Sequence, residues 1–383
     1  MVAPNGYFIY FLHPGLKKFH FFKVYINIKN QPIMLKHSLL ILSLLSMNGC
    51  SSIAYYSQAI GGQLEIFRRS QSIDSLIANP STPAQLKQQL AEILTIRAFA
   101  TSALYLPDND SYTYYADLHR SYVLWSVFAT PAFSFKPKQW CFLIVGCVSY
   151  QGYFKKASAQ ALADELRVQG YDIYVAEIPA YSTLGWFEDP VLNTMLTWHK
   201  LQIAGLIFHE LAHQKIYIAD DTAFNEAFAV AVEQIGIERW LAQSGTPKES
   251  VDYQQSRQRQ AEFVELVLTA RNSIQQIYQQ PLPPKQMEVA KRAAFDKLRA
   301  QYAELKSSWG GFAGYDAWFA KDLNNAKLLS VVTYQDHVPA FMALFEQVGS
   351  DLPAFYDKVA QLGELPTEER HAQLKEALLK FKP

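Results

Sequence analysis

The chain has 383 residues, half of them hydrophobic and 14% aromatic, so it can bury a large core and is not a disordered protein. Its 35 basic and 35 acidic side chains cancel, which leaves no overall field to attract nucleic acid or an anionic membrane surface. Nucleic acid is therefore not an expected partner, and other partners have to be inferred from local sites.

The N-terminal segment indicates export. Residues 1–33 mix aromatic residues with scattered lysines, whereas residues 34–49 begin at a methionine, carry a lysine and continue as an apolar run too short to span a bilayer comfortably. The run ends in Met47-Asn48-Gly49-Cys50, which resembles the lipobox of bacterial lipoproteins, with methionine where leucine is usual. We expect residues 1–33 to be an upstream translation artefact, residues 34–49 a signal peptide and Cys50 the acylated mature N-terminus. The alternative is that residues 34–49 form a buried apolar helix.

A mixed α and β pattern follows this segment. Residues 55–106 have helical periodicity and are expected to pack as helices. Residues 140–148 predict a buried strand, residues 156–168 a helix and residues 171–176 an alternating strand, so a strand-helix-strand unit is expected.

The chain has three cysteines, and Cys141 and Cys147 remain as a pair if Cys50 carries lipid. An oxidising compartment would allow them to join across a bend, but an extended strand would hold their Cα atoms too far apart. A disulfide and two free thiols both stay open.

Beyond residue 178 the sequence predicts a loop region followed by helices. Residues 179–187 are flanked by proline and glycine, and predict an edge strand or rim loop that can receive a peptide backbone by strand addition. The fold class expected is α+β and predominantly helical, with an N-terminal helical part over 50–135, a core over 136–245 and a C-terminal helical part over 246–383. Further helices are expected over residues 223–241, 248–280, 284–307, 317–348 and 367–380.

The motif His209-Glu210-Leu211-Ala212-His213 is the main functional signal. On a helix its two histidines lie one turn apart, roughly 6 Å along the axis, and can share one metal ion. The apolar residues 201–208 before the motif indicate that this helix is buried. One Zn²⁺ ion is the expected cofactor, although another divalent metal would fit the same ligands, and Glu210 is the expected general base.

The next predicted helix supplies the third metal ligand. Glu226 and Glu233 are seven residues apart and share a helix face, and Glu226 lies nearer the start of the helix, where it can face His213. We predict Glu226 as the ligand, with Glu233 and Asn225 in the surrounding shell; a solvated Glu233 is the alternative.

A hydrolytic metal site also needs a donor to the oxyanion and, where the substrate has a free amine, a carboxylate that binds that amine. Tyr334 and Tyr181 are candidate donors, with a structural role as the alternative for each. Candidate amine-binding carboxylates are Glu177, Glu188 and Glu233.

These motifs resemble a known group of enzymes. Phe208–His213 together with the segment Asn225-Glu226-Ala227-Phe228-Ala229 resembles the gluzincin metallopeptidases, which have a zincin-like core of a small sheet and an active-site helix. Residues 146–154, 179–187 and 323–326 resemble a zinc aminopeptidase lipoprotein family of Gram-negative bacteria. That resemblance implies a zinc aminopeptidase acting on peptides, anchored through lipid on Cys50 on the periplasmic side of the envelope, at the outer membrane.

Two other functions fit the same residues. One is a zinc endopeptidase acting on a periplasmic protein, because no exopeptidase motif precedes His209. The other is a catalytically idle, metal-stabilised lipoprotein that serves as an interaction module, against which Glu210 argues because a structural metal needs no general base. The oligomeric state is left open by the sequence.

Overall fold

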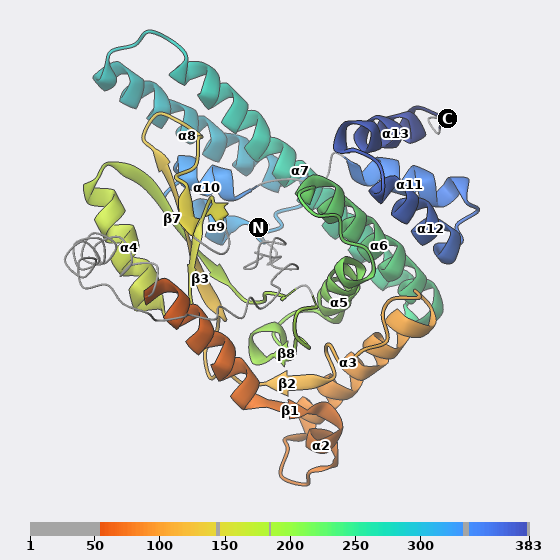
Figure 1. Ribbon diagram of the computed structural model, residues 1–383. Coiled ribbons are helices and arrows are strands. Elements are labelled where there is room, and N and C mark those ends of the chain that lie inside the picture. The colour runs from red at the N-terminus through yellow and green to blue at the C-terminus, as the bar shows by residue number, and fades with distance from the viewer. Residues whose placement is uncertain (1–53, 143–145, 184, 332–336, 381–383) are drawn as a thin grey trace, which may run out of the picture.

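The computed structural model describes residues 54–142, 146–183, 185–331 and 337–380. The expected α+β, predominantly helical fold is confirmed (Figure 1). The predicted signal segment and Cys50 lie outside the described residues. Within the described ranges, no helix combines the length and apolar character needed to cross a membrane.

The elements follow one another along the chain with short connections. After a helix over residues 54–69, the strands are β1 (Ser70–Ser72), β2 (Tyr114–Ala116), β3 (Leu124–Pro131), β4 (Trp140–Phe142), β5 (Gly146–Val148), β6 (Gln151–Tyr153), β7 (Tyr171–Ile178) and β8 (Val191–Leu192). The helices are α2 (Ile73–Ala78), α3 (Ala84–Ser102), α4 (Lys156–Val168), α5 (Lys200–Lys215), α6 (Thr222–Ser244), α7 (Pro247–Tyr278), α8 (Pro284–Ser308), α9 (Asp316–Ala320), α10 (Asn325–Ser330), α11 (Val338–Gln347), α12 (Leu352–Gly363) and α13 (Thr367–Lys380).

The main sheet is antiparallel, with β3 between β6 and β7. Because successive side chains of a strand face opposite sides, Trp125 and Val127 pack against α4, whereas Leu124 packs in a second core with Leu206 of α5. The sheet is thus covered on both faces. It also crosses the boundary expected at residue 136, since β3 precedes it and β7 follows it.

A smaller sheet, in the order β1-β2-β8, determines where two loops lie. β2 and β8 are parallel neighbours, with Tyr115 opposite Val191. The loops that precede these two strands, residues 103–113 and the described residues 179–183 and 185–190, therefore lie side by side. This arrangement is extended by a hydrogen bond from the Tyr112 amide to the Asp189 carbonyl at 2.7 Å.

The single buried strand predicted over residues 140–148 is wrong. β4 and β5 form an antiparallel hairpin in which Cys141 lies opposite Cys147, and the two residues form a disulfide with a Cα–Cα distance of 3.9 Å. The chain reverses direction between the cysteines, so the argument from an extended strand does not apply. Residues 179–187, where an edge strand or a rim loop was expected, form a loop over the residues that the structure describes.

The long helix predicted over residues 317–348 is also wrong, because the described part of this range contains three separate helices, α9, α10 and α11. The Asn324 side chain caps α10 by accepting a hydrogen bond from the Lys327 amide at 3.0 Å. Pro339 stands in the first turn of α11, where its missing N–H costs nothing. These residues start new helices. The helices expected over residues 248–280 and 284–307 are confirmed as the antiparallel pair α7 and α8.

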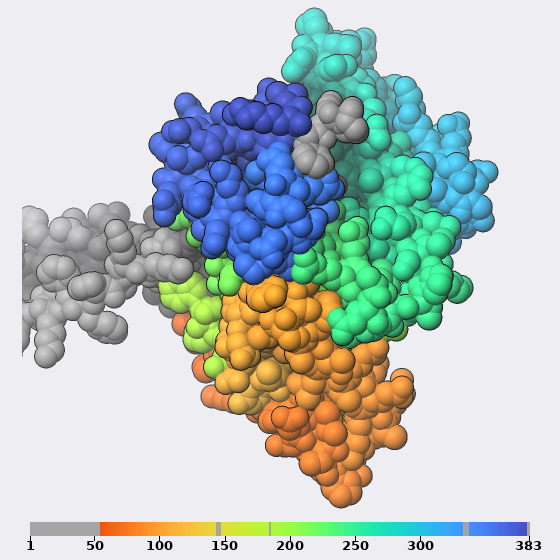
Figure 2. Space-filling model, turned by 90° about the vertical axis from the view of Figure 1, so that its right-hand side faces the viewer, coloured from red at the N-terminus to blue at the C-terminus, as the bar shows by residue number. Residues whose placement is uncertain are grey.

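The largest core joins α5 and α6 to α3 and to the C-terminal helices α11–α13. Phe224 of α6 contacts Phe341 of α11 edge to face, with ring centroids 5.0 Å apart. The Tyr356 hydroxyl of α12 donates to the Leu104 carbonyl, after α3, at 2.7 Å. Figure 2 shows the C-terminal helices directly above α3 on this side of the molecule. α5 and α6 are therefore held from both sides.

Candidate functional site

The residues predicted as metal ligands lie on two adjacent helices, α5 and α6. α5 begins after His199, whose side chain accepts from the Leu201 amide, and it is almost wholly buried up to His213. α6 begins after Asp221, whose carboxylate accepts from the Phe224 amide at 3.1 Å. The two helices are the most closely associated pair of the helical core. Their rigid packing places the motif side chains.

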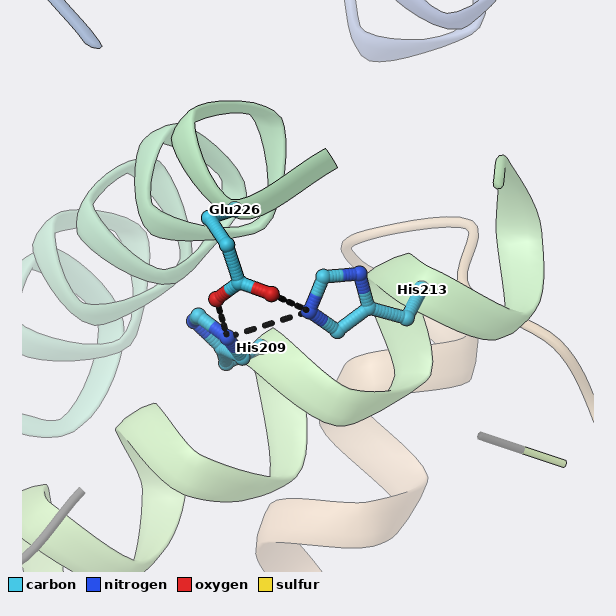
Figure 3. A group of neighbouring side chains, drawn as sticks. All are labelled: His209, His213 and Glu226. Atoms are coloured by element: carbon cyan, nitrogen blue, oxygen red, sulfur yellow. Dashed lines mark hydrogen bonds and ion pairs between the residues drawn. The ribbon is translucent and has the colours of Figure 1, made fainter. Parts of the chain in front are cut away.

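His209, His213 and Glu226 converge on one point, as Figure 3 shows. The two Nε2 atoms lie 3.2 Å apart, Glu226 Oε2 is 3.6 Å from His209 Nε2, and Glu226 Oε1 is 3.7 Å from His213 Nε2. A tetrahedral ion with bonds of about 2.1 Å separates its ligands by about 3.4 Å. The donor set therefore has the spacing and chemistry that one such ion requires.

The electrostatics of the three groups also suit a cation. Burial opposes a charged His209, but hydrogen bonds with Glu226 and Glu233 raise its pKa to about 10. Burial lowers the pKa of His213 to about 3. Burial works against an ionised Glu226 too, yet its bond with His209 holds its pKa below the usual value. The carboxylates of Glu226 and Glu233 thus both face the His209 imidazole in a buried site, where a divalent ion would neutralise their negative charge.

Glu233 contacts the far side of a predicted metal ligand. Its Oε2 lies 3.3 Å from His209 Nδ1, so the carboxylate fixes the ring orientation and tautomer. Asn225 does something different: its side chain accepts from the Ile218 amide at 2.8 Å and donates to the Ile218 carbonyl at 2.7 Å. Asn225 therefore holds the loop between α5 and α6 against the first turn of α6.

Glu210 lies between the ligand triad and the two neighbouring loops, since it interacts electrostatically with His209 and Glu226 and also with Ser182 and Asp189. It is fully buried, and neither of its carboxylate oxygens has a hydrogen-bond partner among the described residues. Burial raises its pKa to about 8, against the lowering influence of His209 and Ser182. A buried carboxylate without donors is costly, so the site is built to accept a proton or hydrogen bond from something else.

The surroundings of Glu210 were not predicted from the sequence. The Ser182 hydroxyl donates to Asp189 Oδ2 at 2.9 Å, and Thr183 donates to the same carboxylate through its amide and its hydroxyl. Tyr112 lies beside Ser182 and Glu210, and its backbone φ of 66° is in the left-handed region. These residues come from the two loops that the small sheet brings together, and no local motif marks them.

The candidate oxyanion donors have different positions. Tyr181 packs edge to face on Phe154, with centroids 5.8 Å apart, and its hydroxyl donates to Gln63 of the first helix. Tyr334 lies outside the described residues. Tyr217, which the sequence did not indicate, lies beside the triad, its ring centroid 6.1 Å from that of His213.

The candidate amine-binding carboxylates are also separated. Glu177 pairs with Lys156 at 3.3 Å and with Lys321 at 3.4 Å. Glu188 lines a surface pocket. Glu233 is the one of the three that contacts a predicted metal ligand.

Comparison with known proteins finds a family to which the chain is similar. A protein-family model described as "Putative aminopeptidase" matches residues 54–374, which include α5, α6 and both loops beside Glu210. No curated protein matches the chain, and neither does any solved structure. The match spans most of the chain, so the protein belongs to the family described as "Putative aminopeptidase".

Proposed function

We propose that the protein is a zinc-dependent peptidase, and specifically an aminopeptidase. The observation that carries the proposal is the convergence of His209, His213 and Glu226 next to a buried Glu210 carboxylate that has no hydrogen-bond donor among the described residues. The family description supports a peptidase-like function. A zincin-like core, in which the sheet flanks α5, is part of the same proposal.

The ion would be held by His209 Nε2, His213 Nε2 and the Glu226 carboxylate. When bound, zinc lowers the pKa of a coordinated water and polarises the scissile carbonyl. Glu233 keeps the His209 ring oriented with Nε2 toward the other ligands. No step requires these three side chains to move.

Glu210 has the acid–base role. Its free carboxylate oxygens accept the proton of the attacking water, and the same group passes that proton to the leaving amine. α5 and the loops around Tyr112 and Ser182 keep solvent away from it. This role separates an enzyme from a metal-stabilised scaffold, which would need no base beside its ligands.

The ligand and base assignments are tested with two substitutions. Glu226→Ala should strip most of the zinc measured by metal analysis, because two imidazoles alone bind it weakly. Glu210→Gln should retain zinc and abolish peptide hydrolysis, a loss of at least about 10²-fold. Full zinc retention by Glu226→Ala would remove that residue from the ligand set, and unchanged turnover by Glu210→Gln would defeat the mechanism.

The choice between exo- and endopeptidase is made with matched peptides. The aminopeptidase proposal predicts hydrolysis of peptides with a free amine and none of the same peptides after N-acetylation. Cleavage of the acetylated peptides at internal bonds would favour an endopeptidase acting on a periplasmic protein.

We also propose that the protein is attached by lipid on Cys50 to the periplasmic side of the envelope, at the outer membrane. The lipobox-like sequence supports this, and the Cys141–Cys147 disulfide is of a kind that persists in oxidising compartments. Cells expressing the protein should incorporate labelled fatty acid into it, and Cys50→Ser should remove the label. Labelling that persists in Cys50→Ser would refute the anchor.

A further inference from the structure

A surface pocket of about 590 Å³ lies outside the predicted metal site. Its walls carry four aromatic residues, Phe67, Tyr114, Trp186 and Phe187. Trp186 is 39% exposed and Phe187 46% exposed, although large aromatic side chains are usually buried. Phe67 holds Phe187 edge to face, with ring centroids 5.0 Å apart. The aromatic surface is therefore ordered and open to a ligand.

The pocket adjoins the helix face that carries Glu210. Gln214 lies one turn after Glu210 on α5, so the two share a face and are roughly 6 Å apart along the axis. The Gln214 side chain accepts from Asn109 Nδ2 at 2.7 Å and donates to Ser111 Oγ at 3.3 Å, and both partners line the pocket. A Cβ on pocket-lining Gly185 would lie 3.0 Å from Gln214 Cγ.

The same two loops connect the pocket to the proposed catalytic centre. Ser111 lines the pocket, while the next residue, Tyr112, lies beside Glu210. Residues 185–188 line the pocket, while Ser182 lies beside Glu210. An extended peptide advances about 3.4 Å per residue, so a side chain two or three residues from the scissile bond would reach the pocket.

The charge of the pocket determines which kind of side chain it favours. Among the described residues that line it, Glu188 is the one carboxylate and none is basic. A carboxylate surrounded by aromatic faces attracts a cation, because the negative face of each ring and the carboxylate act in the same direction. An anionic side chain would be repelled.

We infer that this pocket is a substrate subsite that binds a long basic side chain, arginine or lysine, two or three residues from the bond that is cleaved. The inference rests on the proposed peptidase function. The cation lies at Glu188, and the aliphatic stem stacks on Trp186 and Phe187.

The test uses alanine peptides in which one residue is varied and moved along the chain. That residue is arginine, norleucine, whose unbranched neutral side chain stands in for the aliphatic stem without the cation, or glutamate. Binding to the Glu210→Gln protein is measured by calorimetry, which needs no turnover, and kcat/KM is measured on the wild-type enzyme. At the favoured position the arginine peptide should have an affinity and a kcat/KM about tenfold higher than the norleucine peptide, and the glutamate peptide should bind most weakly.

Two variants and one control locate the preference. Glu188→Gln should reduce the affinity and kcat/KM of the arginine peptide to those of the norleucine peptide. Trp186→Leu should reduce both values for the arginine peptide severalfold. Glu165→Gln, an exposed carboxylate on α4, should leave the preference intact. Equal binding of arginine and norleucine by the wild-type protein, or a preference that survives Glu188→Gln, would overturn the inference.

Failure of the pocket and failure of the proposed function give different results. If no peptide is hydrolysed but binding of the arginine peptide still depends on Glu188, the pocket is supported as a binding site for a basic side chain and the peptidase proposal is refuted. If peptides are hydrolysed without any dependence on Glu188, the peptidase stands and the subsite is refuted.

Discussion

Asp189 is a buried carboxylate that pairs with no cation among the described residues. It is 4% exposed and accepts hydrogen bonds from Ser182 and from the amide and hydroxyl of Thr183. Burial raises its pKa from 3.8 to about 6, against the lowering influence of these bonds. The group fastens the loop beside Glu210 at a cost in folding free energy whenever it is ionised.

This cost predicts a pH dependence of stability. Because the pKa is raised on folding, the folded state binds more protons than the unfolded state between pH 3.8 and about 6, and the unfolding free energy falls as pH rises through that range. In Asp189→Asn the unfolding free energy should fall by roughly 2 to 3 kcal/mol less over this pH range than in the wild type, since the asparagine side chain stays neutral. Urea unfolding at both ends of the range measures the effect.

Asp164 provides the control because it lies on the surface of α4. Asp164→Asn should leave the difference between the two pH values unchanged. An Asp189→Asn protein with the wild-type pH dependence would show that the carboxylate does not titrate as described.

At the residue scale, the sequence indicates those site residues that lie close together in the chain. His209, Glu210 and His213 lie within two turns of one helix, so their spacing is visible in the chain itself. The residues around Glu210 come from two loops that are separated in the sequence by the whole main sheet, and their proximity depends on the pairing of β2 with β8. No spacing rule applies to such residues.

At the scale of elements, two glycines determine how closely α5 and α6 approach. A Cβ on Gly205 of α5 would lie 3.0 Å from Glu233 Oε1 of α6. A Cβ on Gly236 of α6 would lie 2.6 Å from the Phe208 ring of α5. The first contact involves the end of a flexible side chain next to His209, and the second involves rigid core packing.

The two glycines therefore predict separable effects. Gly205→Ala should displace Glu233 from His209 and weaken zinc binding about 10-fold or more, while alanine's better helix propensity keeps stability within about 1 kcal/mol of wild type. Competition with a chelator measures the affinity. Gly236→Ala should instead lower the unfolding free energy by about 1 to 3 kcal/mol.

Gly61 is a matched control, because a Cβ there meets nothing within 4 Å. Gly61→Ala should change neither property adversely. If Gly205→Ala bound zinc as tightly as wild type, the contact between Glu233 and His209 would have no part in metal affinity.

Long helices were predicted well because their periodicity is repeated over many turns, as in α7 and α8. The central strand β3 was not predicted, because it is buried on both faces and has no alternation to distinguish it from a buried helical segment. The hairpin of β4 and β5 and the three helices in residues 316–347 depend on local turns and caps that interrupt an otherwise continuous apolar pattern.

At the scale of the whole molecule, Asn325 links the main sheet to the helical pair α7 and α8. Asn325 is fully buried. Its side-chain Nδ2 donates to the Ala132 carbonyl at 3.0 Å, and its backbone N–H donates to Asp172 Oδ2 at 3.0 Å. The Tyr278 hydroxyl of α7 donates to Asn325 Oδ1 at 2.8 Å, and Lys291 of α8 donates to Asp172 at 2.7 Å. Residues 323–326, which resemble a family segment, therefore join two parts of the fold.

Removing the Asn325 side chain should loosen this junction. Asn325→Ala leaves carbonyls and a hydroxyl buried without partners, and should cost roughly 3 kcal/mol of unfolding free energy. Tyr278→Phe removes one bond only and should cost about 1 kcal/mol. Denaturant unfolding gives both values, and hydrogen exchange should show the largest loss of protection in α7 and α8. A cost below that of Tyr278→Phe would contradict this role.

The ligand set has a further consequence for how the protein assembles. His209 and Glu233, the outermost of the four groups at the predicted metal site, are 24 residues apart in the chain, and all four lie on one helical hairpin. Contacts of such short sequence separation form early in folding, whereas the loops around Glu210 need the strands β2 and β8 to meet. In the proposed metalloenzyme the hairpin would therefore capture its ion before the base is enclosed, so metal uptake would precede the acquisition of activity during folding.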